Sequence, residues 1–272
     1  MRLFLLLLCL ALPLATPVLA QTTDTRLEAM QTGDDMRGWR AVGRLNLGTR
    51  GFCTATLIAP DLVLTAAHCL FDKETGARVD VASIEFLAGW RSGRAEAYRH
   101  IKTALPHPDY VYSGADNLDR VAFDLALLRL DQPIRLPSIK PFGTDSGPAA
   151  GDQVSVVSYA QDRAEVPSLQ RSCHVLERQP SIVVMNCDVD FGSSGAPIFA
   201  LRDGIEKIVS IVSAKAEVDG KRVALGTSVT APLATLITAM DSDASGSAFK
   251  PRLLSGGTAS GAKFMKAPPK SP

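Results

Sequence analysis

The chain has 272 residues, of which 46% are hydrophobic and 21% are charged, and its formal net charge is +1. This is the composition of a globular protein with ample apolar material for a core. The near-zero charge and the lack of a basic patch with interleaved aromatic residues argue against nucleic-acid binding. We therefore expect no nucleic-acid partner.

Residues 1–20 have the pattern of a secretory signal peptide. Arg2 supplies the positive end, Leu3–Leu12 is an apolar stretch, and the sequence VLA before Gln21 is a small-residue cleavage site. The alternative is a membrane anchor, but the apolar stretch is too short to span a bilayer. We expect a secreted or periplasmic protein without a membrane partner.

The rest of the chain divides into a leader, a folded domain and a tail. Residues 21–38 are polar and include the sequence TGDD, which favours a flexible leader or a short propeptide. Residues 39–240 carry the regular pattern of a folded domain. Residues 241–272 turn to Ser, Gly, Ala, Lys and Pro without a sustained apolar face, and we predict a disordered tail.

Within residues 39–240, short runs rich in Val, Ile, Leu and Thr alternate with Gly, Pro, Asp and Asn. This spacing predicts an all-β barrel or sandwich. Residues 131–152 hold four prolines, three of them in the first half, and no sustained periodicity, which predicts a linker between two subdomains. Val229–Met240 is the one long helical candidate and could close the domain as a C-terminal helix.

Four cysteines remain once Cys9 leaves with the signal peptide. In an exported chain an even number favours disulfides, and four cysteines allow three pairings. No two of them are two to four residues apart and the chain has no HExxH motif, so we expect no metal site. The four are Cys53, Cys69, Cys173 and Cys187.

Three stretches place polar residues in apolar or glycine-rich company. His68 ends LVLTAAHC, and Asp124 lies in VAFDLALLRL. A buried carboxylate costs several kcal/mol unless it is paired, and an imidazole is a natural partner. The third stretch, DFGSSGAPIF (190–199), is first of all a tight turn. Yet a nucleophilic serine needs such a loop, because glycines allow a sharp bend and let backbone N–H groups converge.

Together these stretches resemble the trypsin-like (chymotrypsin-fold) serine proteases, especially the secreted bacterial branch. GFCTATLIAPDLVLTAAHCL resembles the histidine segment of that family, DLALLRL its aspartate segment and GSSGAPIF its serine segment, in the same order. The resemblance covers residues 39–240. It implies two six-stranded antiparallel β-barrels packed together, followed by a C-terminal helix.

The resemblance also implies the chemistry. Ser194 occupies the nucleophile position, His68 that of the general base, and Asp124 that of the residue which orients the imidazole. The backbone N–H groups of Gly192 and Ser194 would form the oxyanion hole. The protein would be a monomeric exported serine endopeptidase that cleaves protein or peptide substrates through an acyl-enzyme, without a cofactor. The alternative is a non-catalytic homologue that binds a partner through the old cleft.

Further expectations come from the same resemblance. It implies two disulfides, Cys53–Cys69 beside the histidine and Cys173–Cys187 near the serine loop. Ser213, in IVSIVSA, resembles the strand serine that lines the substrate channel and contacts the aspartate.

Two positions bear on activation and specificity. Ser193 stands where many animal members carry an aspartate that pairs with a newly freed N-terminus, so we expect other hydrogen bonds to hold the loop. Asp188 lies six residues before Ser194, an offset that in the family reaches the base of the specificity pocket. A buried carboxylate there would favour Arg or Lys in the substrate. Lys215 could neutralise Asp188 from within the pocket.

Overall fold

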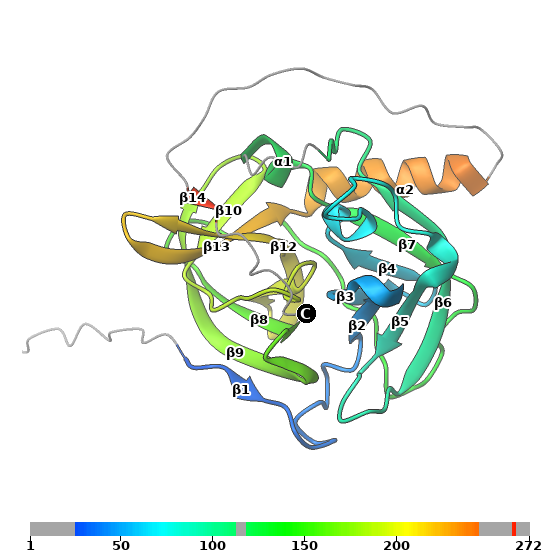
Figure 1. Cartoon of the computed structure of the whole chain (residues 1–272). Coiled ribbons are helices and arrows are strands. Elements are labelled where there is room, and N and C mark those ends of the chain that lie inside the picture. Colours follow the sequence, from blue (N-terminus) through cyan, green and yellow to red (C-terminus); the bar gives the residue numbers. More distant parts are fainter. Residues whose placement is uncertain (1–24, 113–117, 245–262, 265–272) are drawn as a thin grey trace, which may run out of the picture.

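The computed structural model describes residues 25–112, 118–244 and 263–264. Two antiparallel β-barrels lie side by side, and a C-terminal helix, α2, runs along one of them (Figure 1). This arrangement confirms the all-β class with two six-stranded barrels and a C-terminal helix. The predicted signal peptide (1–20) and most of the predicted tail (241–272) lie outside the described residues.

The first barrel is a closed ring in the order β2-β3-β4-β7-β6-β5. Its interior is filled by large apolar side chains such as Leu45, Phe86 and Leu127, all fully buried. Three short 3₁₀ helices, η1 (Gly48–Arg50), η2 (Ala67–Leu70) and η3 (Val81–Ser83), connect strands of this half. The strands are β2 (Val42–Leu47), β3 (Phe52–Ala59), β4 (Leu62–Thr65), β5 (Ile84–Ala88), β6 (Ala97–Pro106) and β7 (Ala126–Leu130).

The second barrel runs in the order β9-β10-β13-β12-β11-β8 and closes through the pairing of β8 with β9. Two further short strands, β1 (Glu28–Ala29) and β14 (Lys263–Phe264), pair with β9 and β12. The barrel strands are β8 (Gln153–Ala160), β9 (Arg163–Arg178), β10 (Ile182–Met185), β11 (Pro197–Arg202), β12 (Ile205–Val218) and β13 (Lys221–Ser228).

The stretch predicted as a linker, residues 131–152, runs from the end of β7 to the start of β8. This stretch contacts both barrels. The backbone N–H of Phe142 donates to the carbonyl of Leu57 in the first barrel over 3.0 Å, and its ring lies 4.6 Å from that of Phe199 in the second. Trp39 packs on Phe199 from another side at 5.1 Å. These contacts fix one barrel against the other.

The described part of the predicted leader, residues 25–38, is packed on the second barrel and is not loose. Strand β1 pairs with Ser168 and Leu169 of β9. Met30 and Met36, two apolar residues in the polar stretch, are each only 2% exposed. Their burial gives this segment a hydrophobic anchor that its overall polarity did not predict.

Helix α2 (Thr230–Ala244) begins one residue after and ends four residues beyond the predicted Val229–Met240. Leu233, Leu236 and Met240 are buried, and their spacing of three and four residues puts them on one face of the helix. That face packs against β6 and β7 of the first barrel. Within the described ranges, no helix has the length and apolar content needed to cross a membrane.

The structure contains the two disulfides that the resemblance implied, Cys53–Cys69 and Cys173–Cys187. The first joins β3 to η2, the short helix that carries His68. The second joins β9 to the segment that leads into the serine loop. Each bridge therefore tethers a candidate site segment to a barrel strand.

We predict that the double variant Cys53→Ala/Cys69→Ala loses about 3 kcal/mol of unfolding free energy, because a cross-link of this loop length restricts the unfolded chain by about that amount. Urea denaturation of the variant and of the wild type, with and without reductant, measures the loss. The folded wild type should contain no free thiol once residues 1–20 are removed. One reactive thiol per folded molecule would contradict the two-bridge structure.

Candidate active site

Strand pairing in the first barrel brings His68 and Asp124 together. Thr65 of β4 lies opposite Ala126 of β7. His68 follows Thr65 by three residues on η2, and Asp124 precedes Ala126 by two residues, after the short helix α1 (Leu118–Ala122). Two segments that are 56 positions apart in the chain therefore meet at the same end of the barrel.

The carboxylate of Asp124 is fully buried and accepts hydrogen bonds from three donors. Nδ1 of His68 lies 2.6 Å from Oδ2, and the backbone N–H of His68 donates to Oδ1 over 2.8 Å. The hydroxyl of Ser213 also donates to Oδ2. Burial raises the pKa of Asp124, but the charge of His68 and these hydrogen bonds outweigh burial and hold the pKa below its ordinary value. Asp124 is therefore ionised at neutral pH.

Ser213 comes from β12, so the second barrel contributes directly to the setting of Asp124. Its side chain is buried at the contact between the barrels. Thr227 of β13 adds a second link, because its hydroxyl donates to the carbonyl of Val121 over 2.6 Å. The predicted contact of Ser213 with the aspartate is present.

Ser194 lies in a loop that is clamped between the two barrels. The carbonyl of Ser194 accepts from the backbone N–H of Thr54 in β3 over 2.8 Å, and the N–H of Gly195 donates to Val212 of β12 over 2.8 Å. Gly195 has a φ of 79°. A Cβ on Gly195 would overlap the hydroxyl of Thr65 and the carbonyl oxygen of Thr54. Glycine is required here for both conformation and space.

Ser194, Gly192 and His68 line one cavity of about 340 Å³. The hydroxyl of Thr54 holds the carbonyl of Gly192 at 2.9 Å. Among the described residues, neither the N–H of Gly192 nor that of Ser194 donates a hydrogen bond within the protein. Two unused backbone donors beside a serine hydroxyl are the arrangement that can stabilise a developing oxyanion.

The buried side chain of Ser193 holds this loop in place of the absent aspartate. Its hydroxyl lies 3.2 Å from the carbonyl oxygen of Tyr159 and accepts from the N–H of Asp190 over 3.3 Å. Nη2 of Arg163 lies 3.4 Å from the same hydroxyl. The backbone N–H of Ser193 donates to the carbonyl of Asp190 over 2.8 Å. The expected replacement of an ion pair by other hydrogen bonds is thus observed.

The surroundings of Asp188 differ from expectation. Asp188 is exposed, and its backbone N–H donates to the side chain of Gln170 over 2.8 Å. It is therefore not the buried carboxylate that we expected at the base of a pocket. The expectation that Lys215 neutralises Asp188 is also wrong, because Nζ of Lys215 lies 2.6 Å from Asp190 and 4.0 Å from the ring centre of Phe191.

Sequence reasoning missed Asp190, Phe191 and Arg163 as neighbours of the serine loop. Burial raises the pKa of Asp190, but its hydrogen bonds with Lys215 and Phe191 and the charge of Lys215 lower it overall. Asp190 and Phe191 directly precede the Gly-Ser-Ser-Gly turn, so their position in the sequence was the available signal. Their pairing with Lys215 depends on how β12 passes this loop, which no local pattern indicates.

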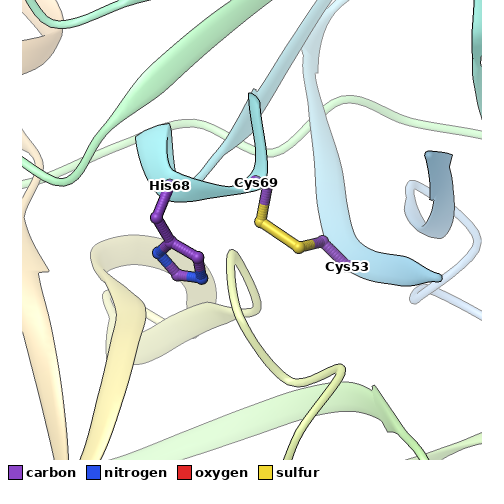
Figure 2. Close-up of side chains that lie close together, drawn as sticks. All are labelled: Cys53, His68 and Cys69. Carbon is purple, nitrogen blue, oxygen red and sulfur yellow. A yellow bond between two sulfur atoms is a disulfide. The ribbon is translucent and has the colours of Figure 1, made fainter. Parts of the chain in front are cut away.

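The ring of His68 also lies near the sulfur atoms of Cys53 and Cys69, and these three side chains have ligand atoms within 4.8 Å of one another. Figure 2 shows the imidazole of His68 and the side chain of Cys69 leaving η2 next to each other, with the disulfide running on to Cys53. Because both sulfurs are in the disulfide, neither is a thiolate that could bind a metal. The cluster is explained by the bridge beside the histidine.

Comparisons with known proteins agree with this geometry. The family model for Trypsin matches residues 33–237. The chain is 26% identical over 152 residues to Glutamyl endopeptidase of Bacillus licheniformis, covering 55% of this chain and 45% of that protein. It is 35% identical over 141 residues to human Kallikrein-15, covering 50% and 48%, and 28% identical over 165 residues to human Serine protease 23, covering 54% and 42%. The chain thus spans less than half the length of these curated relatives.

A solved structure titled Structure of Glu endopeptidase in complex with MPD has the same fold. It superposes with a TM-score of 0.63 at 19% sequence identity, and the match covers 81% of this chain and 98% of that chain.

We predict that Gly195→Ala lowers the unfolding free energy by about 2–5 kcal/mol, because backbone strain and steric overlap act together. Gly204→Ala is the matched control. Gly204 has a similar φ of 76°, but an added Cβ there would meet nothing within 4 Å. The control should therefore lose only the strain, about 1–2 kcal/mol. Equal losses in the two variants, measured by urea denaturation, would contradict the close packing at Gly195.

Proposed function

Because the chain belongs to the trypsin family, we propose that it is a serine endopeptidase that cleaves peptide bonds through an acyl-enzyme on Ser194. One observation carries the proposal: the buried carboxylate of Asp124 is bonded to Nδ1 of His68, and the same histidine shares a cavity with Ser194. This arrangement leaves Nε2 of His68 as the ring atom available for proton transfer.

The proposed reaction proceeds in two halves. Oγ of Ser194 attacks the carbonyl carbon of the scissile bond while Nε2 of His68 takes the hydroxyl proton. The tetrahedral intermediate collapses, His68 returns the proton to the departing amine, and an ester on Ser194 remains. Water then attacks this ester by the same proton transfers, which releases the acid product and regenerates Ser194.

Asp124 serves this cycle by electrostatics and orientation. Its ionised carboxylate accepts the Nδ1 proton of His68, which fixes the tautomer with Nε2 unprotonated, and it stabilises the imidazolium formed in each half-reaction. The N–H groups of Gly192 and Ser194 would bind the oxyanion. Each donor of this kind contributes about 3 kcal/mol to lowering the barrier.

We further propose that the protein acts on protein or peptide substrates after export. The support comes from the signal-peptide pattern of residues 1–20 and from the two disulfides, which form and persist in oxidising compartments. Removal of residues 1–20 would leave a chain whose four remaining cysteines are all paired.

We predict that Ser194→Ala and His68→Ala each reduce kcat on a casein-derived peptide mixture by about 10⁴- to 10⁶-fold, the range that loss of a triad member causes in other serine proteases. Both variants should keep the circular dichroism spectrum of the wild type. His100→Ala is the control, because His100 is exposed on β6 and should leave the activity unchanged.

Labelling with a fluorophosphonate separates the endopeptidase from a non-catalytic homologue. The wild type should form one adduct on Ser194, whereas Ser194→Ala should form none. A folded wild type without an adduct, or a His68→Ala variant with wild-type turnover, would contradict the proposed function.

A further inference from the structure

The two edges of β12 have different neighbours. Strand β13 pairs along one edge from Ser210 to Val218. On the opposite edge, β11 pairs as far as Ile211. Val212 then donates to the carbonyl of Ala196 over 2.9 Å and accepts from the N–H of Gly195 over 2.8 Å. The edge that faces away from β13 therefore reaches the serine loop at Val212.

Strand β14 occupies the same edge a few residues further on. It pairs with Ala216 and Glu217 of β12 (Figure 1). At these positions β13 already holds the other edge, because Ala216 lies opposite Val223. The C-terminal segment therefore lies on the edge that also meets the serine loop, with Ser213, Ala214 and Lys215 between them.

The direction of β14 points it toward the site. The pairing is antiparallel, with Lys263 opposite Glu217 and Phe264 opposite Ala216, so the backbone advances toward lower residue numbers of β12. Ser213, whose hydroxyl donates to Asp124, lies three residues from Ala216, about 10 Å along a strand. A peptide strand laid on this edge in the same direction would lead to Ser194.

We propose that the C-terminal segment of this chain around Lys263–Phe264 is a resident competitor of substrate, held on the β12 edge Ser213–Val218 along which a substrate strand would lie. The inference rests on the proposed endopeptidase function. Docking of this kind uses backbone hydrogen bonds and accepts many sequences, which suits both a resident segment and a substrate.

Substrate can displace β14, but β14 still raises the substrate concentration that is needed. The described pairing of β14 involves only two residues, and so short a strand is weakly held by itself. Because β14 and β12 belong to one chain, the pairing is intramolecular, which gives β14 a local concentration at β12 on the order of mM. A substrate peptide can therefore displace β14, but only at a higher apparent KM.

The test uses the full chain with two prolines, Lys263→Pro/Phe264→Pro, because proline removes the N–H groups that a ladder needs. The matched control carries two prolines outside β14, Ala259→Pro/Ser260→Pro. We expect the first variant to lower KM for a peptide substrate about 3- to 10-fold with unchanged kcat, as removal of a tethered competitor requires. The control should keep the KM of the wild type.

A second measurement does not depend on activity. In a Ser194→Ala background, hydrogen exchange at the amides of residues 215–217 should be faster in the Lys263→Pro/Phe264→Pro chain than in the control. A labelled peptide of residues 258–272 should bind that double-proline chain more tightly than it binds the control.

Unchanged exchange together with equal peptide binding would overturn the docking. Faster exchange with an unchanged KM would overturn the competition. Protection that rises with protein concentration would mean docking between copies and would also contradict the proposal. An inactive wild type would instead refute the proposed function, while exchange and peptide binding would still decide whether β14 docks on β12.

Discussion

The buried negative charge of Asp124 is the interaction on which the site depends. An unpaired carboxylate in this position would cost several kcal/mol, and removing one partner from a buried pair is strongly destabilising. Two hydrogen-bond donors from His68 in the first barrel and one from Ser213 in the second compensate this charge. The same hydrogen bonds that compensate the charge also orient the imidazole, so the packing of the two barrels sets the geometry of the site.

Hydrogen bonds from both barrels also hold the serine loop. Thr54 of β3 bonds the carbonyls of Ser194 and Gly192, while Val212 of β12 bonds Gly195. These contacts use two carbonyl groups of the loop and the N–H of Gly195, and they leave the N–H groups of Gly192 and Ser194 unused among the described residues. A rigid loop with unused donors is preorganised, and preorganisation is what makes oxyanion stabilisation effective.

The sequence predicted the parts of this structure that local patterns encode. Short runs rich in Val, Ile, Leu and Thr predicted the all-β class, and the long helical candidate Val229–Met240 predicted α2, although its end was placed four residues early. The resemblance supplied what local patterns could not, including the disulfide partners and the approach of Ser213 to Asp124. Other features escaped both kinds of reasoning. The packing of β1 on β9, the pairing of Lys215 with Asp190 and that of β14 with β12 all join segments distant in sequence, and no periodicity records such contacts.

The most direct test of the account is the protonation of His68, observed by ¹H–¹⁵N correlation spectra of the folded protein labelled with ¹⁵N-histidine. We expect a strongly downfield proton on Nδ1 of His68, because a short hydrogen bond to the ionised carboxylate of Asp124 deshields it. This signal should be absent from His68→Ala and should move upfield in Asp124→Asn. A wild-type spectrum in which His68 carries its proton on Nε2 and none on Nδ1 would contradict the account.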